Sequence, residues 1–338
     1  MKRVLLTGGC GFVGHHLAAA LVKRDYHVTI IDKLTYASVG FARLREVGLL
    51  PERGEAPLVK VFSHDFASKM PQYLEEELGK IDVVLHVGAE THVDRSIADP
   101  EPFVEANVMG TLRTLQLAVR KRVGMFLYFS TDEIFGPAPA GTSYREDDRY
   151  RSGNPYAASK AGGEEMAVAF HNTYGLPVIV THTMNLYGER QHAEKFIPKV
   201  VGQVLRGERV TVHADASRTR AGSRFYLYAS DLVDAVLFLV EHGVAGEKYN
   251  VGGEREVSNL DVAKRIAEIV RKPLNYEMVD FHSARPGHDL RYALDSSKLH
   301  GMGFRHAVGF DAGLERTVKW YLANPNWLYD AKREVLGG

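Results

Sequence analysis

Two adjacent carboxylates, Asp132 and Glu133, follow directly after an apolar run that ends at Phe129, with Ser130 and Thr131 between. A short apolar run of this kind is typical of a buried strand, so the two acids are predicted at a strand end. Consecutive side chains leaving a strand point in different directions, and two carboxylates could therefore address neighbouring atoms of one substrate. One would remove a proton while the other donates one. A solvated turn is the alternative interpretation.

A second candidate pair is Tyr156 and Lys160, four residues apart and hence on one face of the helix that Asn154 and Pro155 are predicted to begin. An ammonium near a phenol favours the phenolate and lowers the pKa of the phenol. A phenolate beside a nicotinamide ring could take a proton from a sugar hydroxyl while hydride leaves the carbon. An ordinary exposed helix is the alternative, since this spacing is common there.

A glycine-rich loop near the N-terminus supplies the context for such a pair. Residues 7–14 (TGGCGFVG) lie between an apolar strand and an amphipathic helix, and they satisfy G-x-G-x-x-G. Glycines at these positions allow a tight turn and close approach of the backbone to a pyrophosphate, which the helix N-terminus then binds. We expect cofactor contacts from Gly8, Gly11, Phe12, Val13 and Gly14.

Asp32 ends the second predicted strand, 18 residues after Gly14. A carboxylate at that place accepts hydrogen bonds from the adenosine ribose and repels a 2′-phosphate, which favours NAD over NADP. Lys33, next to it, weakens this inference. Asp65 and Phe66 follow the third predicted strand and are expected near the adenine.

The elements that position these residues alternate along the chain. Apolar strands are predicted at 4–7, 28–31, 58–62, 83–86, 126–129 and 178–181, and helices at 12–24, 68–78, 101–121 and 155–173. Continuous apolar strands separated by helices indicate a parallel sheet covered on both faces. The predicted fold is α/β, a Rossmann-type doubly wound parallel sheet with a smaller C-terminal α/β lobe. Residues 35–57 are interpreted as a long polar connection.

The chain is predicted to divide near residue 183. Residues 1–183 form the predicted NAD-binding domain, to which 225–255 contribute because 249–252 resemble one more strand of its sheet. Residues 184–338 are mainly a substrate-binding lobe, with helices at 196–206, 230–242, 258–271 and 311–323. Its loops are rich in arginine, glycine and histidine, which suits an anionic ligand.

The overall composition excludes several classes of protein. The 338 residues carry a formal net charge of zero, so nothing points to nucleic acid or to an anionic membrane surface. No apolar stretch approaches the ~20 residues of a membrane span, and no signal peptide is expected. The single cysteine, Cys10, cannot form a disulfide within the chain, which favours a reducing, cytoplasmic location. No metal site is predicted.

Several sequence blocks together resemble those of the extended short-chain dehydrogenase/reductases and, more closely, the dTDP-glucose 4,6-dehydratases. The resemblance is carried by the glycine loop, by Tyr156 and Lys160, and by DKLTYA at 32–37, AETHVDRS at 89–96, STDE at 130–133, NLYG at 185–188, EKFIP at 194–198 and RPGHD at 285–289. These blocks run through nearly the whole chain in the order found in the family.

The resemblance implies an internal redox cycle on a nucleotide-sugar, with NAD as cofactor. Hydride passes from sugar C4 to NAD, water is eliminated across C5–C6, and the hydride returns to C6. By resemblance Glu133 is the base for the C5 proton, Asp132 the acid for the C6 hydroxyl, and Thr131 a hydrogen-bonding partner of the C4 oxygen that assists Tyr156. Asp132 would have to keep its proton near neutral pH, and burial beside Glu133 would raise its pKa.

The same resemblance implies which residues bind the substrate. A nucleotide-sugar carries a diphosphate, for which cations and amides are suitable partners. The expected substrate-binding residues are His92, Asn185, Lys195, Arg224, Asn259, Arg285 and His288. His92 could equally be a packing histidine, and each of the cations could be an ordinary surface residue.

The chain departs from the family pattern at several places, mostly in its second half. His182 stands where arginine is usual, Leu186 replaces the second of two asparagines, and Glu189-Arg190 replace a more apolar pair. Gly88 stands where alanine is usual, and residues 214–223 are a few residues longer than expected. The reaction is therefore better defined by the sequence than the substrate.

The same motifs are also compatible with other functions. A UDP- or CDP-sugar could replace the dTDP-sugar. A nucleotide-sugar 4-epimerase or decarboxylase would share the oxidation at C4 but would not need Asp132 and Glu133. A non-catalytic protein that senses NAD belongs to a different class and would typically lose the tyrosine or the lysine. The resemblance also implies a homodimer formed through two helices of each subunit, one of them carrying Tyr156 and Lys160.

Overall fold

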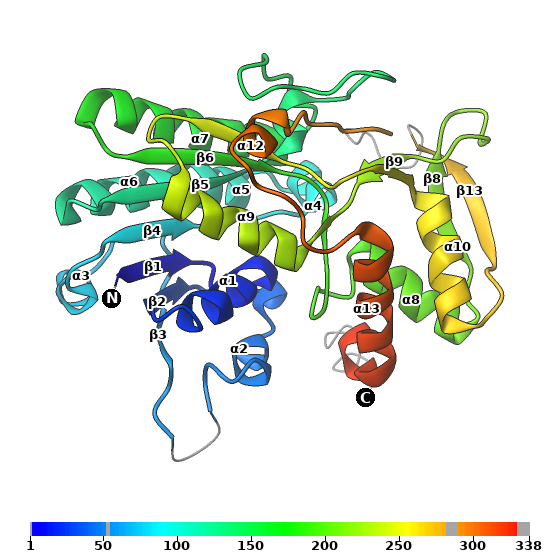
Figure 1. Cartoon of the computed structure of the whole chain (residues 1–338), viewed down its shortest axis with the longest axis horizontal. Helices are drawn as coiled ribbons and strands as arrows, with labels where there is room; N and C mark the ends of the chain where they lie inside the picture. Colours follow the sequence, from blue (N-terminus) through cyan, green and yellow to red (C-terminus); the bar gives the residue numbers. More distant parts are fainter. Residues whose placement is uncertain (1, 52–54, 282–289, 330–338) are drawn as a thin grey trace. The chain divides into compact units, whose positions relative to one another are not determined.

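The computed structural model describes residues 2–51, 55–281 and 290–329. The chain folds into two compact units (Figure 1). The first comprises the chain up to Phe135, Glu146–Thr183 and Val233–Asn250, and the second comprises Gly136–Arg145, Met184–Leu232 and the chain from Val251 onward. Residues 136–145, which the sequence assigned to the first domain, belong to the second unit because their backbone hydrogen-bonds to residues 291–295 there.

A seven-stranded sheet forms the centre of the first unit, in the order β11-β6-β5-β4-β1-β2-β3. Its strands are β1 (Arg3–Thr7), β2 (His27–Asp32), β3 (Val59–Ser63), β4 (Val83–His86), β5 (Met125–Thr131), β6 (Val178–Thr183) and β11 (Lys248–Val251). Neighbours from β3 to β6 pair in parallel. The strand order reverses direction between β1 and β4, and ligands bind beside such a reversal at the carboxyl ends of the strands. The predicted Rossmann-type sheet is confirmed, including its late strand β11.

Helices connect these strands in the order α1 (Phe12–Val22), η1 (Tyr36–Ser38), α2 (Ala42–Glu46), α3 (Gln72–Leu78), α4 (Val93–Ala98), α5 (Glu101–Val104), η2 (Glu105–Met109), α6 (Gly110–Lys121), η3 (Asp132–Phe135), α7 (Pro155–Tyr174) and α9 (Ala229–His242). Helix α1 packs on β2, while α6 and α7 lie side by side and α7 packs on β5 and β6 (Figure 1). None of the helices in the described part of the chain is long and apolar enough to span a membrane.

Three of the predicted elements differ in detail from the observed ones. The connection at 35–57 is not wholly irregular, because α2 forms where Arg43 and Leu44 become fully buried. The helix expected at 68–78 begins at Gln72, since Pro71 occupies its N-cap. The helix expected at 101–121 is interrupted by the π-helical turn η2, which carries the buried Asn107.

In its described residues, the second unit contains three pairs of short strands and a group of helices. Strands β7 (Leu186–Tyr187) and β10 (Leu227–Tyr228) are parallel, as are β8 (Val210–Ala214) and β13 (Tyr276–Asp280), while β9 (Ser223–Phe225) and β12 (Glu256–Ser258) are antiparallel. The helices are α8 (Phe196–Arg206), α10 (Asn259–Val270), α12 (Ser297–Gly301), α13 (Phe310–Ala323) and η4 (Pro325–Leu328).

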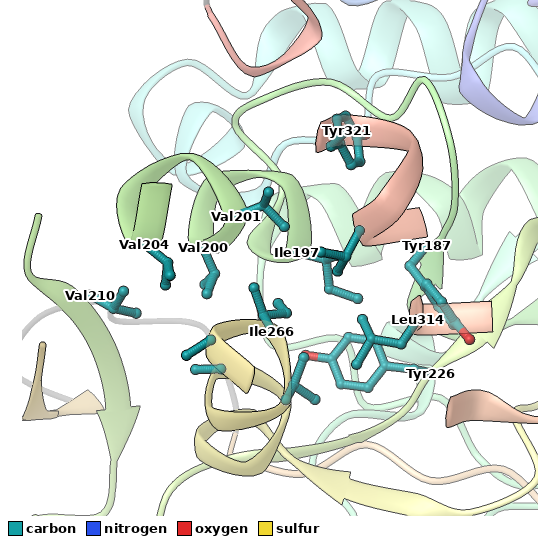
Figure 2. Close-up of a cluster of buried hydrophobic side chains, with 14 of the residues drawn as sticks. Tyr187, Ile197, Val200, Val201, Val204, Val210, Tyr226, Ile266, Leu314 and Tyr321 are labelled. Carbon is teal, nitrogen blue, oxygen red and sulfur yellow. The ribbon is translucent and has the colours of Figure 1, made fainter. Parts of the chain in front are cut away.

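The core of the second unit is assembled from helix faces that the periodicity of the sequence predicts. Ile197, Val200, Val201 and Val204 recur along one side of α8 and are at most 2% exposed. Figure 2 shows them beside Ile266 of α10 and Leu314 of α13. Tyr187 and Tyr226 close this core, with ring centroids 6.2 Å apart. This packing fixes the loops that carry the candidate substrate residues.

Candidate active site

The acids that the sequence singled out lie at the carboxyl end of β5. Thr131 is the last residue of the strand, and Asp132 and Glu133 begin η3. Asp132 is 5% exposed, and its Oδ1 accepts a hydrogen bond from the Thr131 hydroxyl at 3.2 Å. The Glu133 amide in turn donates to Thr131 Oγ1 at 3.4 Å. A burial this deep does not agree with a solvated turn at Asp132.

Helix α7 begins beside these acids. Asn154 caps it, as predicted, because its side-chain oxygen accepts from the Ala157 amide at 2.8 Å, and Pro155 is the first helical residue. The Asn154 amide group also donates to Glu133 Oε2 at 3.2 Å. Sequence reasoning assigned Asn154 only the capping role. The cap therefore joins the strand-end acids to the helix that carries Tyr156.

Tyr156 and Lys160 are both buried on α7, 8% and 4% exposed. Thr131 hydrogen-bonds the Tyr156 side chain, and Lys160 follows Tyr156 one turn along α7. The expected lowering of the Tyr156 pKa is wrong for the unliganded chain. Burial raises the pKa of Tyr156, and the charges of Glu133 and Asp132 raise it further. Burial also lowers the pKa of Lys160 to about 7, which weakens the effect of its charge on the phenol.

The glycine loop has the geometry expected of a phosphate cradle. Gly8 has a φ of +68°, and a Cβ there would lie 2.6 Å from the Gly88 Cα. A Cβ on Gly14 would overlap the Gly8 carbonyl oxygen. Phe12 and Val13 are the first two residues of α1, whose N-cap Gly11 offers no side-chain hydrogen bond, so backbone N–H groups at this end can bind an anion. These residues fit a dinucleotide.

Asp32 is tied to the glycine loop by the backbone. Its Oδ2 accepts from the Cys10 amide at 2.9 Å and its Oδ1 from the Leu34 amide at 2.8 Å. Each carboxylate oxygen keeps accepting capacity for a ribose hydroxyl. Burial raises the pKa of Asp32, while these two hydrogen bonds and the nearby Arg43 oppose that rise. Lys33 Nζ lies 3.0 Å from Glu90 Oε1, so the Lys33 ammonium forms an ion pair with Glu90.

Arg43 is a part of this site that sequence reasoning missed. The side chain is fully buried, and Nη1 donates to the carbonyl oxygens of Cys10 at 3.3 Å, Ala37 at 2.7 Å and Ser38 at 2.9 Å. One guanidinium thus joins the glycine loop to the segment that follows Asp32. No periodicity or motif around Arg43 signals this role, because its partners are backbone carbonyls and one of them, that of Cys10, lies in a distant loop.

Phe66 is packed against two glycines. Its ring packs so closely on Gly88 and Gly110 that a Cβ on either would overlap it. A phenyl ring at 66 thus accounts for Gly88, where alanine is usual in the family. The neighbouring Asp65 accepts from the Ala67 amide at 2.8 Å, which shapes the turn after β3.

His92 occupies the N-cap of α4, where its Nδ1 accepts from the Arg95 amide at 3.4 Å. The ring is half-buried, and this local contact fits the capping role of a structural histidine. The proposed contact of His92 with a sugar remains a prediction.

The second unit brings three of the candidate substrate residues to one region. Arg224 lies in β9, and the backbone amide of Asn259, at the start of α10, donates to the Gly222 oxygen at 2.8 Å. The Asn185 carbonyl accepts from the Leu227 amide, just beyond β9, at 2.9 Å. Lys195 is the N-cap residue of α8. Arg285 and His288 lie outside the described residues.

The guanidinium and amide of this region already have protein partners. Arg224 Nη1 donates to the carbonyl oxygens of Ser223 and Leu290, each at 2.7 Å. The Asn259 side-chain oxygen accepts from the Tyr226 hydroxyl at 2.8 Å. These bonds hold both side chains in place.

Known proteins resemble the chain over nearly its whole length. Residues 4–252 match the NAD dependent epimerase/dehydratase family. A dTDP-glucose 4,6-dehydratase of Haemophilus influenzae is 37% identical over 349 aligned positions, which cover 96% of this chain and 99% of that protein.

Two solved structures show how far the fold is shared. A dTDP-glucose 4,6-dehydratase of Streptomyces venezuelae with NAD bound superposes with a TM-score of 0.85 at 35% identity, covering 96% of this chain and 98% of that one. A UDP-glucose 4-epimerase of Thermus thermophilus in complex with NAD superposes with a TM-score of 0.82 at 29% identity, covering 95% of this chain and 99% of that one. Backbone similarity alone therefore does not separate dehydratase from epimerase. The extent of the match nevertheless assigns the chain to the NAD dependent epimerase/dehydratase family.

Proposed function

We propose that the chain is an NAD-dependent nucleotide-sugar 4,6-dehydratase that converts dTDP-glucose to dTDP-4-keto-6-deoxyglucose. The observation that carries the proposal is the buried meeting of Asp132, Glu133 and Thr131 with Tyr156 at the carboxyl end of β5. An epimerase or decarboxylase that oxidises C4 needs the tyrosine but has no use for a second acid–base pair. The named relatives support the same reading of the substrate.

The first step is the oxidation at C4, and three side chains serve it. Tyr156 takes the proton of the C4 hydroxyl, while Thr131 hydrogen-bonds the same oxygen. The Lys160 ammonium stabilises the phenolate on the same helix face. Bound NAD supplies the hydride acceptor for C4 and later the hydride donor for C6.

The second step is the elimination, for which the two acids are responsible. The 4-ketone acidifies the C5 proton, and Glu133 removes it. Asp132 gives a proton to the C6 oxygen as the C6–O bond breaks and water leaves. This assignment requires a protonated Asp132 beside an ionised Glu133. Asp132 is more deeply buried than Glu133, and burial favours the neutral form of a carboxyl group.

NAD is the cofactor that the first unit fits. Gly8, Gly11, Phe12, Val13 and Gly14 would hold the pyrophosphate, Asp32 the adenosine ribose, and Asp65 and Phe66 the neighbourhood of the adenine. The Asp32 carboxylate, fixed by two amides, would repel the 2′-phosphate of NADP.

The second unit is proposed to bind the nucleotide through Asn185, Lys195, Arg224, Asn259, Arg285 and His288, with His92 of the first unit facing the sugar. Residues 1–183 with 225–255 would then be the NAD-binding domain, and 184–338 mainly the substrate-binding lobe. Thymine is the proposed base, and the substitutions at 182–190 are the reason to test uracil and cytosine.

We further propose a cytoplasmic homodimer. The apolar side chains of Ile97 and Val104, 42% and 48% exposed on α4 and α5, favour a covered surface there. The single cysteine is compatible with a reducing compartment. Light scattering of the purified protein would decide between monomer and dimer.

The deciding experiment is a panel of dTDP-, UDP-, CDP- and GDP-glucose, incubated with the protein and NAD without added reductant. Mass spectrometry then reports the loss of one water. Water loss from dTDP-glucose alone is expected. Water loss from another nucleotide-glucose would replace thymine by that nucleotide's base. Formation of an isomer, or release of carbon dioxide from an added hexuronate, would overturn the proposal that the chain is a dehydratase. No product with any sugar would favour the non-catalytic alternative.

A further inference from the structure

A third ionisable residue continues the helix face that carries Tyr156 and Lys160. Glu164 is four residues beyond Lys160, so the three side chains lie one above another along α7. Glu164 is 0% exposed. A fully buried carboxylate is costly unless it is paired, which makes the identity of its partners informative.

The partners of Glu164 come from three segments of the first unit. Its Oε1 lies 3.0 Å from His182 Nε2 on β6 and 2.9 Å from Lys248 Nζ on β11. The Tyr150 hydroxyl, from the loop before α7, donates to the same oxygen. We call these four residues the Glu164 network.

His182 joins the network through both of its ring nitrogens. Its Nε2 lies 3.0 and 3.2 Å from the two Glu164 oxygens, and its Nδ1 lies 2.8 Å from the Asn250 side-chain oxygen. The ring is 0% exposed, so water does not compete for either nitrogen. Burial opposes ionisation of Glu164, but His182, Lys248 and Ser130 outweigh it and hold the pKa of Glu164 below its usual range.

Lys160 is the neighbour that this carboxylate affects. Its Nζ lies 4.3 Å from the centroid of the Tyr128 ring, in a site without solvent. Burial lowers the pKa of Lys160 to about 7, and the Glu164 charge opposes that fall. The Tyr128 hydroxyl donates to the Lys160 carbonyl at 3.0 Å and so fixes the helix against β5. Without Glu164, the Lys160 amine would lose its proton at a lower pH.

We infer that Glu164 is a positioning residue that keeps Lys160 charged, and that the Lys248 ammonium beside it sets how strongly it does so. The inference rests on the proposed role of Tyr156 and Lys160 in oxidation at C4. The groups around Glu164 are His182 from β6, Lys248 from β11, Tyr150 from the preceding loop, Ser130 and Tyr128 from β5, and Lys160 from α7 itself. Among them Lys248 is the second ammonium beside this carboxylate, and its positive charge opposes that of Lys160.

The first test compares Glu164→Gln with Glu165→Gln as a matched control. Glu165 is exposed on the same helix, so its substitution removes the same charge while the contacts between Glu164 and its partners stay in place. The rate of NAD reduction in a single turnover is measured against pH. Activity falls on the alkaline side as Lys160 deprotonates, and in Glu164→Gln this fall is expected to move down by about one pH unit. The control should keep the wild-type profile.

The second test removes the other cation beside Glu164. Lys248→Met takes away a positive charge that disfavours the Lys160 ammonium and leaves Glu164 in place, so the alkaline fall should move to higher pH. Opposite shifts in Glu164→Gln and Lys248→Met follow from charge and not from loosened packing, which would reduce the rate at every pH. An unmoved alkaline fall in both variants would overturn the inference. If Glu164→Gln does not fold, Lys248→Met is tested alone. An alkaline fall in activity at the same pH as in the wild type would then overturn the inference.

A third measurement does not depend on turnover. Competitive labelling of the cofactor-free protein with acetic anhydride, read by peptide mass spectrometry, gives the pH dependence of Lys160 acylation. The midpoint should fall in Glu164→Gln and rise in Lys248→Met. A wild-type chain that neither reduces NAD nor loses water from the sugar would refute the proposed function. A Lys160 midpoint that both substitutions leave unchanged would refute the charge-setting role of Glu164, whatever the reaction is.

Discussion

Asn154 caps α7 through its side-chain oxygen and donates to Glu133 Oε2, at 3.2 Å, through its side-chain nitrogen. One amide thus holds both the start of the helix that carries Tyr156 and an acid at the end of β5. The two proposed catalytic steps use groups on different elements, Tyr156 on α7 and Glu133 after β5. The position of Tyr156 relative to Glu133 therefore depends on the contacts of Asn154.

Asn154→Asp should separate the two roles of Asn154. Asp caps a helix about as well as Asn, so the melting temperature should stay within a few degrees of the wild type. The new carboxylate would face Glu133 and raise its pKa, which should slow deuterium exchange at C5 about tenfold or more while C4 oxidation persists. Asn154→Ala, as the control, should lose about 1 kcal/mol of stability. An undiminished exchange rate in Asn154→Asp would contradict the positioning of Glu133 by Asn154.

Glu133→Gln should uncouple oxidation from elimination. The amide preserves the shape of the side chain but cannot accept the C5 proton, so NADH should form once per site and persist. Dehydrated sugar should fall by about a hundredfold or more, in the range typical of a lost general base. Stopped-flow absorbance of NADH and mass spectrometry of the product measure the two steps. Normal product yield would assign the base to another residue.

Tyr156→Phe should impair the earlier step, the oxidation at C4. The phenyl ring keeps the packing against Phe103, at a centroid distance of 6.4 Å, so the fold should be retained. Loss of the hydroxyl removes the group that accepts the C4 proton, and NADH formation should slow by about a hundredfold or more. Circular dichroism confirms the fold. An unaffected rate would reject Tyr156 as the base.

Gly88→Ala tests the packing of Phe66. The new methyl would lie 2.9 Å from Phe66 Cζ, and even closer to Cε1, which should cost about 1–3 kcal/mol of unfolding free energy. Phe66→Leu combined with Gly88→Ala should recover part of the loss, because the smaller side chain makes room for the methyl. Urea denaturation of both single variants and the double variant gives the coupling energy. Additive effects would show that the two positions do not compete for space.

The buried Lys160 predicts a rise of stability with pH. Because its pKa is about 7 in the folded chain and 10.5 in the unfolded one, the unfolded state binds more protons between these values. Relative to Lys160→Met, the free energy of unfolding of the cofactor-free wild type should therefore rise between pH 7 and pH 9, by up to about 1.4 kcal/mol per unit. Denaturant titrations at several pH values measure this difference. Equal slopes in the two proteins would mean that Lys160 titrates normally when folded.

The local signals in the sequence were sufficient for the elements and for the two reactive pairs. Apolar runs such as 83–86 and 126–129 predicted β4 and β5, because a strand buried on both faces needs apolar residues at every position. The glycine loop and the cap Asn154 follow from backbone requirements of a few consecutive residues. Such signals fail at element starts like Gln72 and at the short α2, whose burial depends on distant partners.

The sequence by itself determined the kind of sheet, the order of its elements and the residue types placed at its carboxyl edge, since each depends on spacing within one segment. Only the tertiary structure decided the ionisation of these residues and what holds them. Arg43 binds the Cys10 carbonyl of the glycine loop from 33 positions away, and Glu164 meets Lys248 across 84 positions. Burial and charge at Tyr156 and Lys160 arise from such contacts, because electrostatic interactions depend on distance in space and on the exclusion of water.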